Sequence, residues 1–258
     1  MTVTTARESR GVATVTVARA AKLNVLDPPT AEALIAAFAD LADDPALRVV
    51  ILRGDGERAM IGGADIEAMA GLTPATARGF ITLIHRCCAA LRACPVPVIA
   101  RCAGYTLGAG LEIAAAADLR IAATDAKFGM PETRIGIPSV VEAALLPGLI
   151  GWGRTRRLLL TGEIIDAARA EAWGLVEEIV APERLDAALA ALVDGLLAAG
   201  PNALRIQKRL IRDWEALPPD QAVRRGIDAF VEAWESPEPA AMMGAFLAAR
   251  RRRKTAGA

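Results

Sequence analysis

The amino-acid sequence predicts an α/β fold that continues into an all-helical C-terminal region. Two patterns carry this prediction: short apolar runs alternate with segments of helical periodicity, and the strand-like runs stop after about Pro182. Apolar strands that alternate with helices are typical of α/β proteins, whose sheets are covered on both faces. We therefore predict an α/β body over residues 1–195 and a helical region over residues 196–258.

The predicted strands are short and apolar. Residues 12–17 form a β-branched run, which favours a strand. Residues 49–52 and 96–100 are continuous apolar runs, as expected of strands buried on both faces, and residues 119–122 are again strand-like.

The predicted helices begin and end at residues that commonly cap or interrupt helices. Thr30 can cap a helix after the turn Asp27-Pro28-Pro29, and Asp43-Asp44-Pro45 ends that helix. Further helices are predicted over residues 73–93, 111–117, 183–199, 201–216, 218–234 and 237–251. The last four helices form a layer too thin to hold a hydrophobic core alone. We therefore expect this layer to pack on the α/β body of its own chain or on another subunit.

The charge balance points to no charged macromolecular partner. The 258 residues include 30 Lys and Arg and 30 Asp and Glu, and the formal net charge is zero. A basic excess of the kind that binds nucleic acid or anionic membranes is absent from the sequence. No secretory signal pattern and no apolar run of ~20 residues occurs, so we expect a cytoplasmic protein. The local run Arg250–Lys254 is either a solvated terminus or a contact for ligand phosphates.

Histidine and cysteine usage argues against a metal or a nucleophilic triad. The cysteines at 87, 88, 94 and 102 form no CxxC pair and are interpreted as reduced apolar residues. His85 is the single histidine; together with Cys88 it offers only two ligands, too few for a metal site. No GxSxG motif accompanies it. We therefore expect catalytic groups, if any, to be carboxylates or backbone N–H groups.

Two strand–glycine-loop–helix units are the first candidates for chemistry. They cover Val49–Asp65 and Val96–Glu112. Glycine allows close backbone approach, and the first N–H groups of a helix lack internal partners, so two such loops can aim two donors at one oxygen. The alternative is that both loops are ordinary tight turns. A dinucleotide fingerprint beginning at Gly108 is broken by Ile113, and no P-loop motif is present.

Two glutamates are the candidate acid and base. Glu112 lies at the start of a predicted helix, where the helix dipole favours the ionised form and suits a general base. Glu132 follows an apolar turn, where burial would raise its pKa and suit a general acid. Each is alternatively a capping or salt-bridge residue, with Arg134 as a possible partner of Glu132.

Several spaced motifs occur in a characteristic order. They are Lys22–Leu26, Leu52–Ile66, Gly104–Glu112, Phe128–Glu132 with Gly136–Pro138, Leu160–Gly162, Ala172–Val176 and Ala245–Leu247. In these motifs the chain resembles the enoyl-coenzyme A (CoA) hydratase/isomerase, or crotonase, family over nearly its whole length. The resemblance implies a crotonase-like spiral of ββα turns with a helical C-terminal region that forms a homotrimer or a homohexamer, a dimer of trimers.

The resemblance also implies the ligand and the roles of site residues. The substrate would be an acyl-CoA thioester, with no further cofactor and no metal. The backbone N–H groups of Ala64 and Ala109 would form an oxyanion hole, and Glu112 and Glu132 would be catalytic. Substrate contacts are expected from Lys22, Leu23, Gly62, Gly63, Asp65, Ile66, Tyr105, Gly108, Gly110, Pro131 and Ser139.

The presence of both glutamates favours hydration of a 2-enoyl-CoA, or the reverse dehydration of a 3-hydroxyacyl-CoA. Alternatives on the same scaffold are an enoyl-CoA isomerase, a carnitinyl-type dehydratase and a decarboxylase; a further one is a non-catalytic relative that binds RNA through Arg250–Lys254. The chain departs from the family pattern at Met60-Ile61, at Glu67 in place of a common lysine, and over residues 139–146. That last segment is expected to shape the acyl pocket.

Overall fold

The computed structural model describes residues 1–256, with side chains up to Arg252. The chain divides into two compact units, Met1–Val193 and Asp194–Ala258. The side chains of Arg253 and Lys254, which belong to the basic run considered above, lie outside the described residues.

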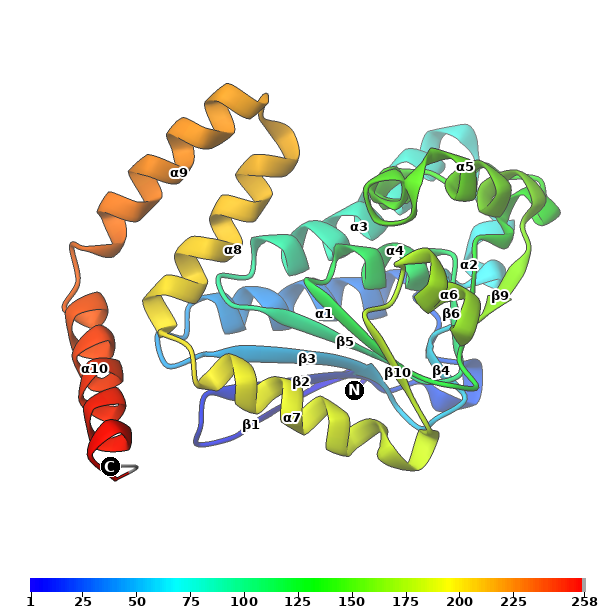
Figure 1. Ribbon diagram of the computed structural model, residues 1–258. Coiled ribbons are helices and arrows are strands. Elements are labelled where there is room, and N and C mark those ends of the chain that lie inside the picture. The colour runs from blue at the N-terminus through cyan, green and yellow to red at the C-terminus, as the bar shows by residue number, and fades with distance from the viewer. Residues whose placement is uncertain (257–258) are drawn as a thin grey trace. The chain divides into compact units, whose positions relative to one another are not determined.

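The first unit contains two sheets (Figure 1). The larger has the order β1-β2-β3-β5-β7-β10, with all neighbours parallel except β1 and β2. Its strands are β1 (Val3–Arg7), β2 (Val12–Val17), β3 (Val49–Gly54), β5 (Val98–Cys102), β7 (Leu119–Ala123) and β10 (Glu178–Val180). The smaller has the order β4-β6-β8-β9, with β9 antiparallel. Its strands are β4 (Ala59–Ile61), β6 (Tyr105–Leu107), β8 (Lys127–Gly129) and β9 (Ile164–Asp166).

The chain winds between these sheets as a spiral. Each of the strand pairs β3–β4, β5–β6 and β7–β8 contributes its first strand to the larger sheet and its second to the smaller sheet. Helices follow the first two pairs: α2 (Ile66–Ala70) and α3 (Pro74–Ala93), then α4 (Ala109–Ala116). This confirms the predicted spiral of ββα turns. The glycine-rich loops of the prediction contain the short strands β4 and β6, whose three residues are too few for a periodic signal.

The remaining helices of the first unit are α1 (Pro28–Ala42), α5 (Leu146–Thr161) and α6 (Ala167–Trp173), and α7 (Leu185–Leu197) begins in this unit and ends in the second. The 3-10 turns of the first unit are η1 (Ala20–Lys22), η2 (Pro131–Ile135), η3 (Val141–Leu145) and η4 (Pro182–Arg184). The cap of α1 differs from the prediction. Asp27, not Thr30, is the N-cap, and its Oδ1 accepts a hydrogen bond from the Thr30 N–H at 3.0 Å. Two prolines then occupy the first turn, where no N–H donor is needed.

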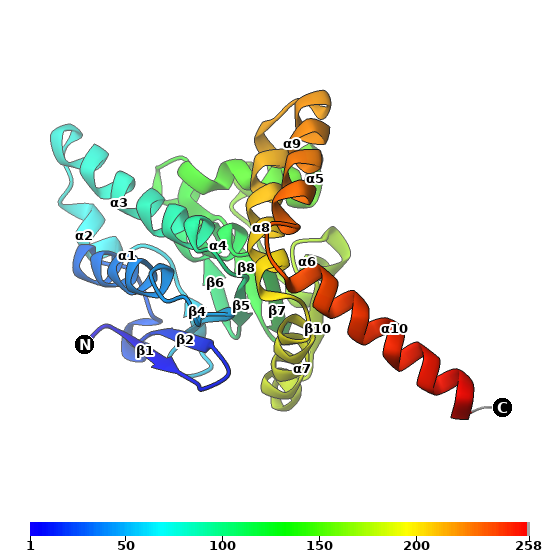
Figure 2. The ribbon, with the colours of Figure 1, turned by 90° about the vertical axis from the view of Figure 1, so that its left-hand side faces the viewer.

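The central strands of the larger sheet, β3, β5 and β7, are mostly apolar and mostly buried on both faces. Alternate residues such as Leu52 and Ala100 belong to a core shared with α1, α3 and α4, which lie side by side (Figure 2). The neighbouring residues along each strand face the opposite side of the sheet. On that side the Arg101 side chain, only 3% exposed, contacts Glu57 at 3.0 Å and Asp186, at the start of α7, at 2.6 Å.

The second unit contains α8 (Pro201–Ala216), α9 (Pro219–Ala233) and α10 (Glu238–Ala256). A small core of Ile206, Leu210 and Ala229 joins α8 to α9. The start of α8 is capped by a side chain of α10, because Glu238 accepts hydrogen bonds from Asn202 N and Ala203 N, both at 2.9 Å.

Within residues 1–256, no single helix is both long and apolar enough to cross a membrane. The consecutive segments Pro182–Leu197 and Pro201–Ala216 meet the length and composition requirement only as a pair.

The start of α4 approaches β4 so closely that only glycine fits. A Cβ atom built on Gly110 would lie 2.0 Å from the carbonyl oxygen of Ile61. Because that oxygen is backbone, the contact cannot be relieved by a side-chain rotation. The approach brings the two glycine-rich loops, one ending at Asp65 and the other at Gly110, next to each other.

We predict that Gly110→Ala lowers the free energy of unfolding by about 3 kcal/mol, since the added methyl group forces the backbone of α4 away from β4. Gly153→Ala is the matched control: Gly153 is exposed in α5, and nothing would lie within 4 Å of a Cβ atom at this position. It should change stability by no more than about 1 kcal/mol. Urea unfolding at equal protein concentration measures both; equal stability of the two variants would contradict the close contact.

Candidate active site

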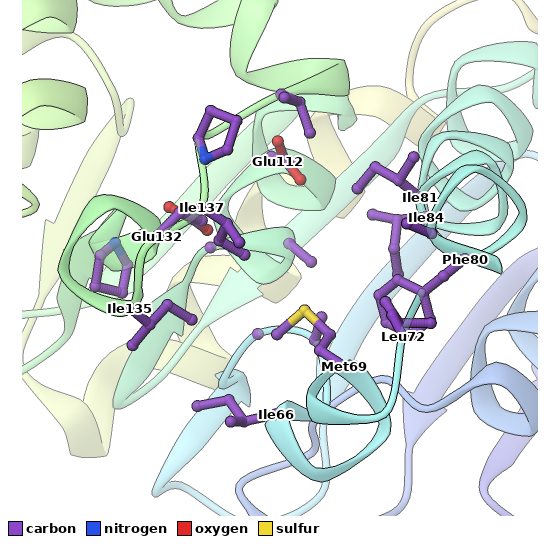
Figure 3. Close-up of a pocket in the computed structure, with 18 of the residues that line it drawn as sticks. Ile66, Met69, Leu72, Phe80, Ile81, Ile84, Glu112, Glu132, Ile135 and Ile137 are labelled. Carbon is purple, nitrogen blue, oxygen red and sulfur yellow. The ribbon is translucent and has the colours of Figure 1, made fainter. Parts of the chain in front are cut away.

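A cavity of about 570 Å³ opens between the two glycine-rich loops, α2, α3 and the segment around η2. Figure 3 shows its two sides: Glu112 and Glu132 lie on one, and an apolar wall faces them on the other. The two carboxyl groups therefore face an apolar surface across the cavity.

The first loop is held in place by pairing with the segment after η1. Gly62 N donates to Leu23 O at 2.8 Å, Leu26 N donates to Gly63 O at 2.9 Å, and Asp65 N donates to Leu26 O at 2.8 Å. Ala64 lines the cavity, and its N–H donates to no partner among the described residues. The loop thus presents an unused backbone donor beside the cavity.

A buried asparagine holds the first glycine-rich loop in place by hydrogen bonds to its backbone. Asn24 is fully buried and has a positive φ of 55°. Its Nδ2 donates to Ala59 O at 2.8 Å and to Asp55 O at 3.0 Å, while its Oδ1 accepts from Arg19 N at 2.9 Å. These bonds satisfy the buried side-chain amide of Asn24, so Asn24 supports the loop rather than contacting a ligand.

The second loop ends at the N-terminus of α4. Gly108 is the N-cap residue with φ +51° and ψ −123°, a conformation open to glycine. Its N–H donates to Gly129 O at 2.9 Å. Ala109 is the first helical residue; its N–H has no partner within residues 1–256, and it also lines the cavity. Both predicted N–H donors therefore border the same space.

Glu112 is buried one turn into α4, at 4% exposure. Its Oε1 accepts a hydrogen bond from Ala143 N at 3.2 Å. Burial, followed by the nearby charge of Glu132, raises the pKa of Glu112 to about 8, with a smaller contribution from Glu142 and an opposing one from the Ala143 bond. The sequence-based expectation of an ionised Glu112 is wrong for the ligand-free site, because loss of hydration outweighs the helix dipole.

Glu132 lies on η2 and is only half-buried. Its Oε2 accepts a hydrogen bond from Ser139 Oγ at 2.8 Å. Arg134 is not its partner, since Nε of Arg134 donates to Thr161 O at 3.1 Å. A Cβ on Gly108 would lie 2.4 Å from Oε1 of Glu132, so this carboxylate sits directly against the second loop.

Of the predicted site residues, Gly62, Gly63, Ala64, Ile66, Gly108, Ala109, Glu112, Pro131 and Glu132 line the cavity. Ser139 and Gly110 lie behind the lining: the first holds Glu132 and the second packs on β4. Tyr105 is in β6, 42% exposed and outside the cavity.

The remaining three predicted residues also lie outside the lining. Lys22 is exposed and pairs with Glu67 at 2.9 Å, so its charge is already matched. Leu23 contributes its carbonyl to the first loop. Asp65 caps α2 by accepting a hydrogen bond from Glu67 N at 3.0 Å.

Sequence reasoning missed the apolar wall, which comes from α2, α3 and their connection. Its residues include Met69, Leu72, Phe80, Ile81 and Ile84. Residues 80, 81 and 84 lie on one face of α3, a spacing that the sequence equally predicts for contacts with the core. The segment 139–146 was expected to form the acyl pocket; only Val140 of that segment lines the cavity, whereas Glu142, Ala143 and Leu146 are buried.

The side chains that commonly bind metal ions are not clustered in the described part of the chain. No group of three or more His, Cys, Asp or Glu side chains there is arranged to hold a metal ion. The four cysteines are free and buried.

Comparison with known proteins gives consistent matches over nearly the whole chain. A family model described as enoyl-CoA hydratase/isomerase matches residues 7–238. The crotonyl-CoA hydratase of Syntrophomonas wolfei subsp. wolfei is 34% identical over 230 residues, covering 89% of this chain and 88% of the relative. The short-chain-enoyl-CoA hydratase of Clostridium acetobutylicum is 32% identical, covering 93% and 92%. A crystal structure of enoyl-CoA hydratase from Mycobacterium smegmatis superposes with a TM-score of 0.93 at 28% identity, covering 96% of each chain.

The raised pKa of Glu112 predicts a pH-dependent stability. The folded state binds its proton up to about pH 8, whereas an unfolded chain releases it near pH 4.3. The stability that this proton contributes is fully present below pH ~4.3 and is lost as the pH rises through the folded pKa. Glu112→Gln, neutral throughout, should therefore be more stable than the wild type at pH 9, by on the order of 5 kcal/mol, and similar to it near pH 4.

Urea unfolding at several pH values between 4 and 9, at one protein concentration, tests this expectation. Glu8→Gln is the control, because Glu8 is exposed near the N-terminus. Parallel stability profiles for the wild type and Glu112→Gln would show that burial does not hold the proton on this residue.

Proposed function

The chain belongs to the enoyl-CoA hydratase/isomerase family, and we propose that it adds water reversibly across the 2,3 double bond of an enoyl-CoA thioester. The observation that carries the proposal is the meeting of two carboxylates, Glu112 and Glu132, with two unused backbone N–H groups around one cavity. Relatives that cover about nine-tenths of the chain are named as enoyl-CoA or crotonyl-CoA hydratases, which supports the same reaction.

In this proposal the N–H groups of Ala64 and Ala109 receive the thioester oxygen. Both lie at the ends of loops that backbone hydrogen bonds and close packing hold in place. As the double bond is attacked, negative charge develops on this oxygen, and fixed donors stabilise it without having to reorient. A donor of this kind typically contributes about 3–4 kcal/mol to lowering the barrier.

The two carboxylates supply the proton transfers. Glu112 takes a proton from the attacking water, whose oxygen bonds to the β-carbon, and Glu132 delivers a proton to the α-carbon. The pair must then hold one proton, located on Glu132 when water adds and on Glu112 when the reverse reaction begins. The proposed chemistry uses only these carboxylates and the backbone donors, and no further cofactor or metal is part of it.

The apolar wall supports a hydrocarbon acyl group. Met69, Phe80 and Ile84 present carbon atoms to the cavity, and Arg78 is also among the lining residues. An acyl chain without a charged group matches this apolar wall, which favours a simple enoyl-CoA over a carnitinyl thioester.

We also propose that the helical unit joins copies of the chain into a homotrimer or a dimer of trimers. On α9 and at its C-terminal end, the large apolar side chains of Val223, Ile227, Phe230 and Trp234 recur at helical spacing and are exposed by 64%, 61%, 65% and 49%. Such a stripe is typical of an interface between subunits. Phe230→Glu should shift the mass measured by light scattering toward the monomer, whereas Glu235→Gln should not; an unchanged mass for Phe230→Glu would contradict an interface at this stripe.

Crotonyl-CoA and longer enoyl-CoA thioesters test the reaction by the loss of absorbance of the conjugated thioester. We expect Glu112→Gln and Glu132→Gln each to lower kcat by about 10²-fold or more, because each removes one proton-transfer group. Glu8→Gln should leave kcat unchanged. The kcat/KM for hydration should follow a bell-shaped pH profile. Its alkaline limb marks the loss of the one proton that the two carboxyl groups must hold, and so lies near the Glu112 pKa of about 8. If the wild type hydrates no enoyl-CoA but isomerises a 3-enoyl-CoA, the hydratase assignment is wrong.

A further inference from the structure

A third carboxylate lies behind the cavity wall, next to Glu112. Glu142, on η3, is 8% exposed and does not line the cavity. Its Oε1 lies 2.8 Å from Nδ1 of His85, and its Oε2 is buried without a hydrogen-bond partner among the described residues. Burying this carboxylate is costly, because a histidine and the weakly donating thiol of Cys88 replace its hydration.

The contact with His85 links η3 to α3. When Glu142 is ionised its oxygen only accepts, so the histidine tautomer that matches this contact carries its proton on Nδ1 and donates it. His85 follows directly after Ile84, one of the apolar residues with which α3 lines the cavity. The hydrogen bond between His85 and Glu142 thus joins α3, which contributes to the apolar wall, to η3, which contacts Glu112.

The next residue in the chain connects this pair to Glu112. Ala143 N donates to Glu112 Oε1 at 3.2 Å. On the other side of Glu142, Val141 has a φ of +39°, which is strained for a β-branched residue. Such a backbone persists only where its surroundings hold it, and here the hydrogen bonds of Glu142 and Ala143 secure the two residues that follow.

His85 is the only basic side chain in contact with Glu142 in the described part of the chain. From α3, Cys88 also lies against it, and from α4 Glu112 faces it; Glu142 and Glu112 both raise the pKa of the Cys88 thiol beyond the effect of burial. Glu132 faces Glu112 from η2. The negative charge on Glu142 is therefore placed beside a carboxyl group that already lies near another carboxylate.

The helix α5 also packs against η3, and its arginines are engaged elsewhere. Arg154 donates to Trp173 O at 2.8 Å, Arg156 lies over the ring of Trp152, and Arg157 pairs with Glu163 at 2.6 Å. None of these contacts places a positive charge on Glu142 or Glu112.

We propose that His85 and Glu142 are positioning residues for Glu112: their hydrogen bond holds the Ala143 N–H on the Glu112 carboxyl group, and the Glu142 charge opposes ionisation of that group. The inference rests on the proposed function for its kinetic consequence, because Glu112 is the group that exchanges a proton with water in that scheme. Neither positioning residue touches the cavity.

Glu142→Gln is the decisive variant, because it keeps the shape and an acceptor for His85 but removes the charge. We expect the alkaline limb of the kcat/KM profile to move to lower pH by about 0.5 unit or more, since a like charge beside Glu112 has gone. A pair that served only as a structural clamp would leave the limb in place. If the apparent pKa of the alkaline limb differs by less than about 0.2 unit between the wild type and Glu142→Gln, the proposal is overturned.

The histidine variants test the link itself. His85→Ala removes the donor to Glu142 and should lower kcat about tenfold, with KM within about twofold, because a misplaced Ala143 N–H affects proton transfer more than binding. His85→Gln can donate from its amide in place of Nδ1 and should keep kcat within about threefold of the wild type. Thr82→Ala is the matched control on the exposed side of α3 and should change neither value. Equal activities of His85→Ala and Thr82→Ala would refute the link.

A stability cycle separates failure of this proposal from failure of the proposed function. If the wild type hydrates no enoyl-CoA, the function is refuted, but the influence of Glu142 on Glu112 can still be measured by unfolding at pH 9. Glu112→Gln should raise the unfolding midpoint less in the Glu142→Gln background than in the wild type, because less repulsion remains to be relieved. Additive effects in this cycle would refute the proposed charge coupling whatever the activity.

Discussion

The contact between Gly110 and the carbonyl oxygen of Ile61 decides how the two halves of the site meet. With no room for a Cβ atom between them, the first turn of α4 lies directly against β4. The ends of both glycine-rich loops are thereby brought to one cavity, which Ala64 and Ala109 both line. Glu112 follows two residues after Gly110 and is drawn into the core with α4.

Competition between burial and the helix dipole sets the protonation of Glu112. A helix N-terminus favours a carboxylate by about 0.3–1 kcal/mol at an exposed site, whereas a raised pKa of about 8 corresponds to several kcal/mol against ionisation. The single hydrogen bond from Ala143 replaces only part of the lost hydration. Glu132, half-buried and bonded to Ser139, lies in a wetter environment. The segment from Ser139 to Ala143 therefore reaches both carboxyl groups.

Much of the fold was predictable because its long elements carry strong periodic signals. The runs that became β2, β3 and β5, the helix α3 and the four C-terminal helices α7–α10 all lie near their predicted positions. The three-residue strands β4 and β6 were not predicted, since their pairing depends on neighbours distant in sequence. For the site, glycine patterns indicated the loops around Ala64 and Ala109. The partners of Glu112 and Glu142 were hidden, because contacts such as Ala143 to Glu112 span 31 residues and leave no local pattern.

Coupling between the buried carboxyl groups has a calorimetric consequence. Near pH 8 the ligand-free site is only partly protonated at Glu112. An apolar ligand that displaces water from the cavity makes ionisation of this group still less favourable, so the complex takes up protons from the buffer. The heat of binding then includes the ionisation heat of whichever buffer donates them. Titrations in phosphate and in Tris would return different apparent enthalpies for the same contacts, and their difference would count the protons that the site gains.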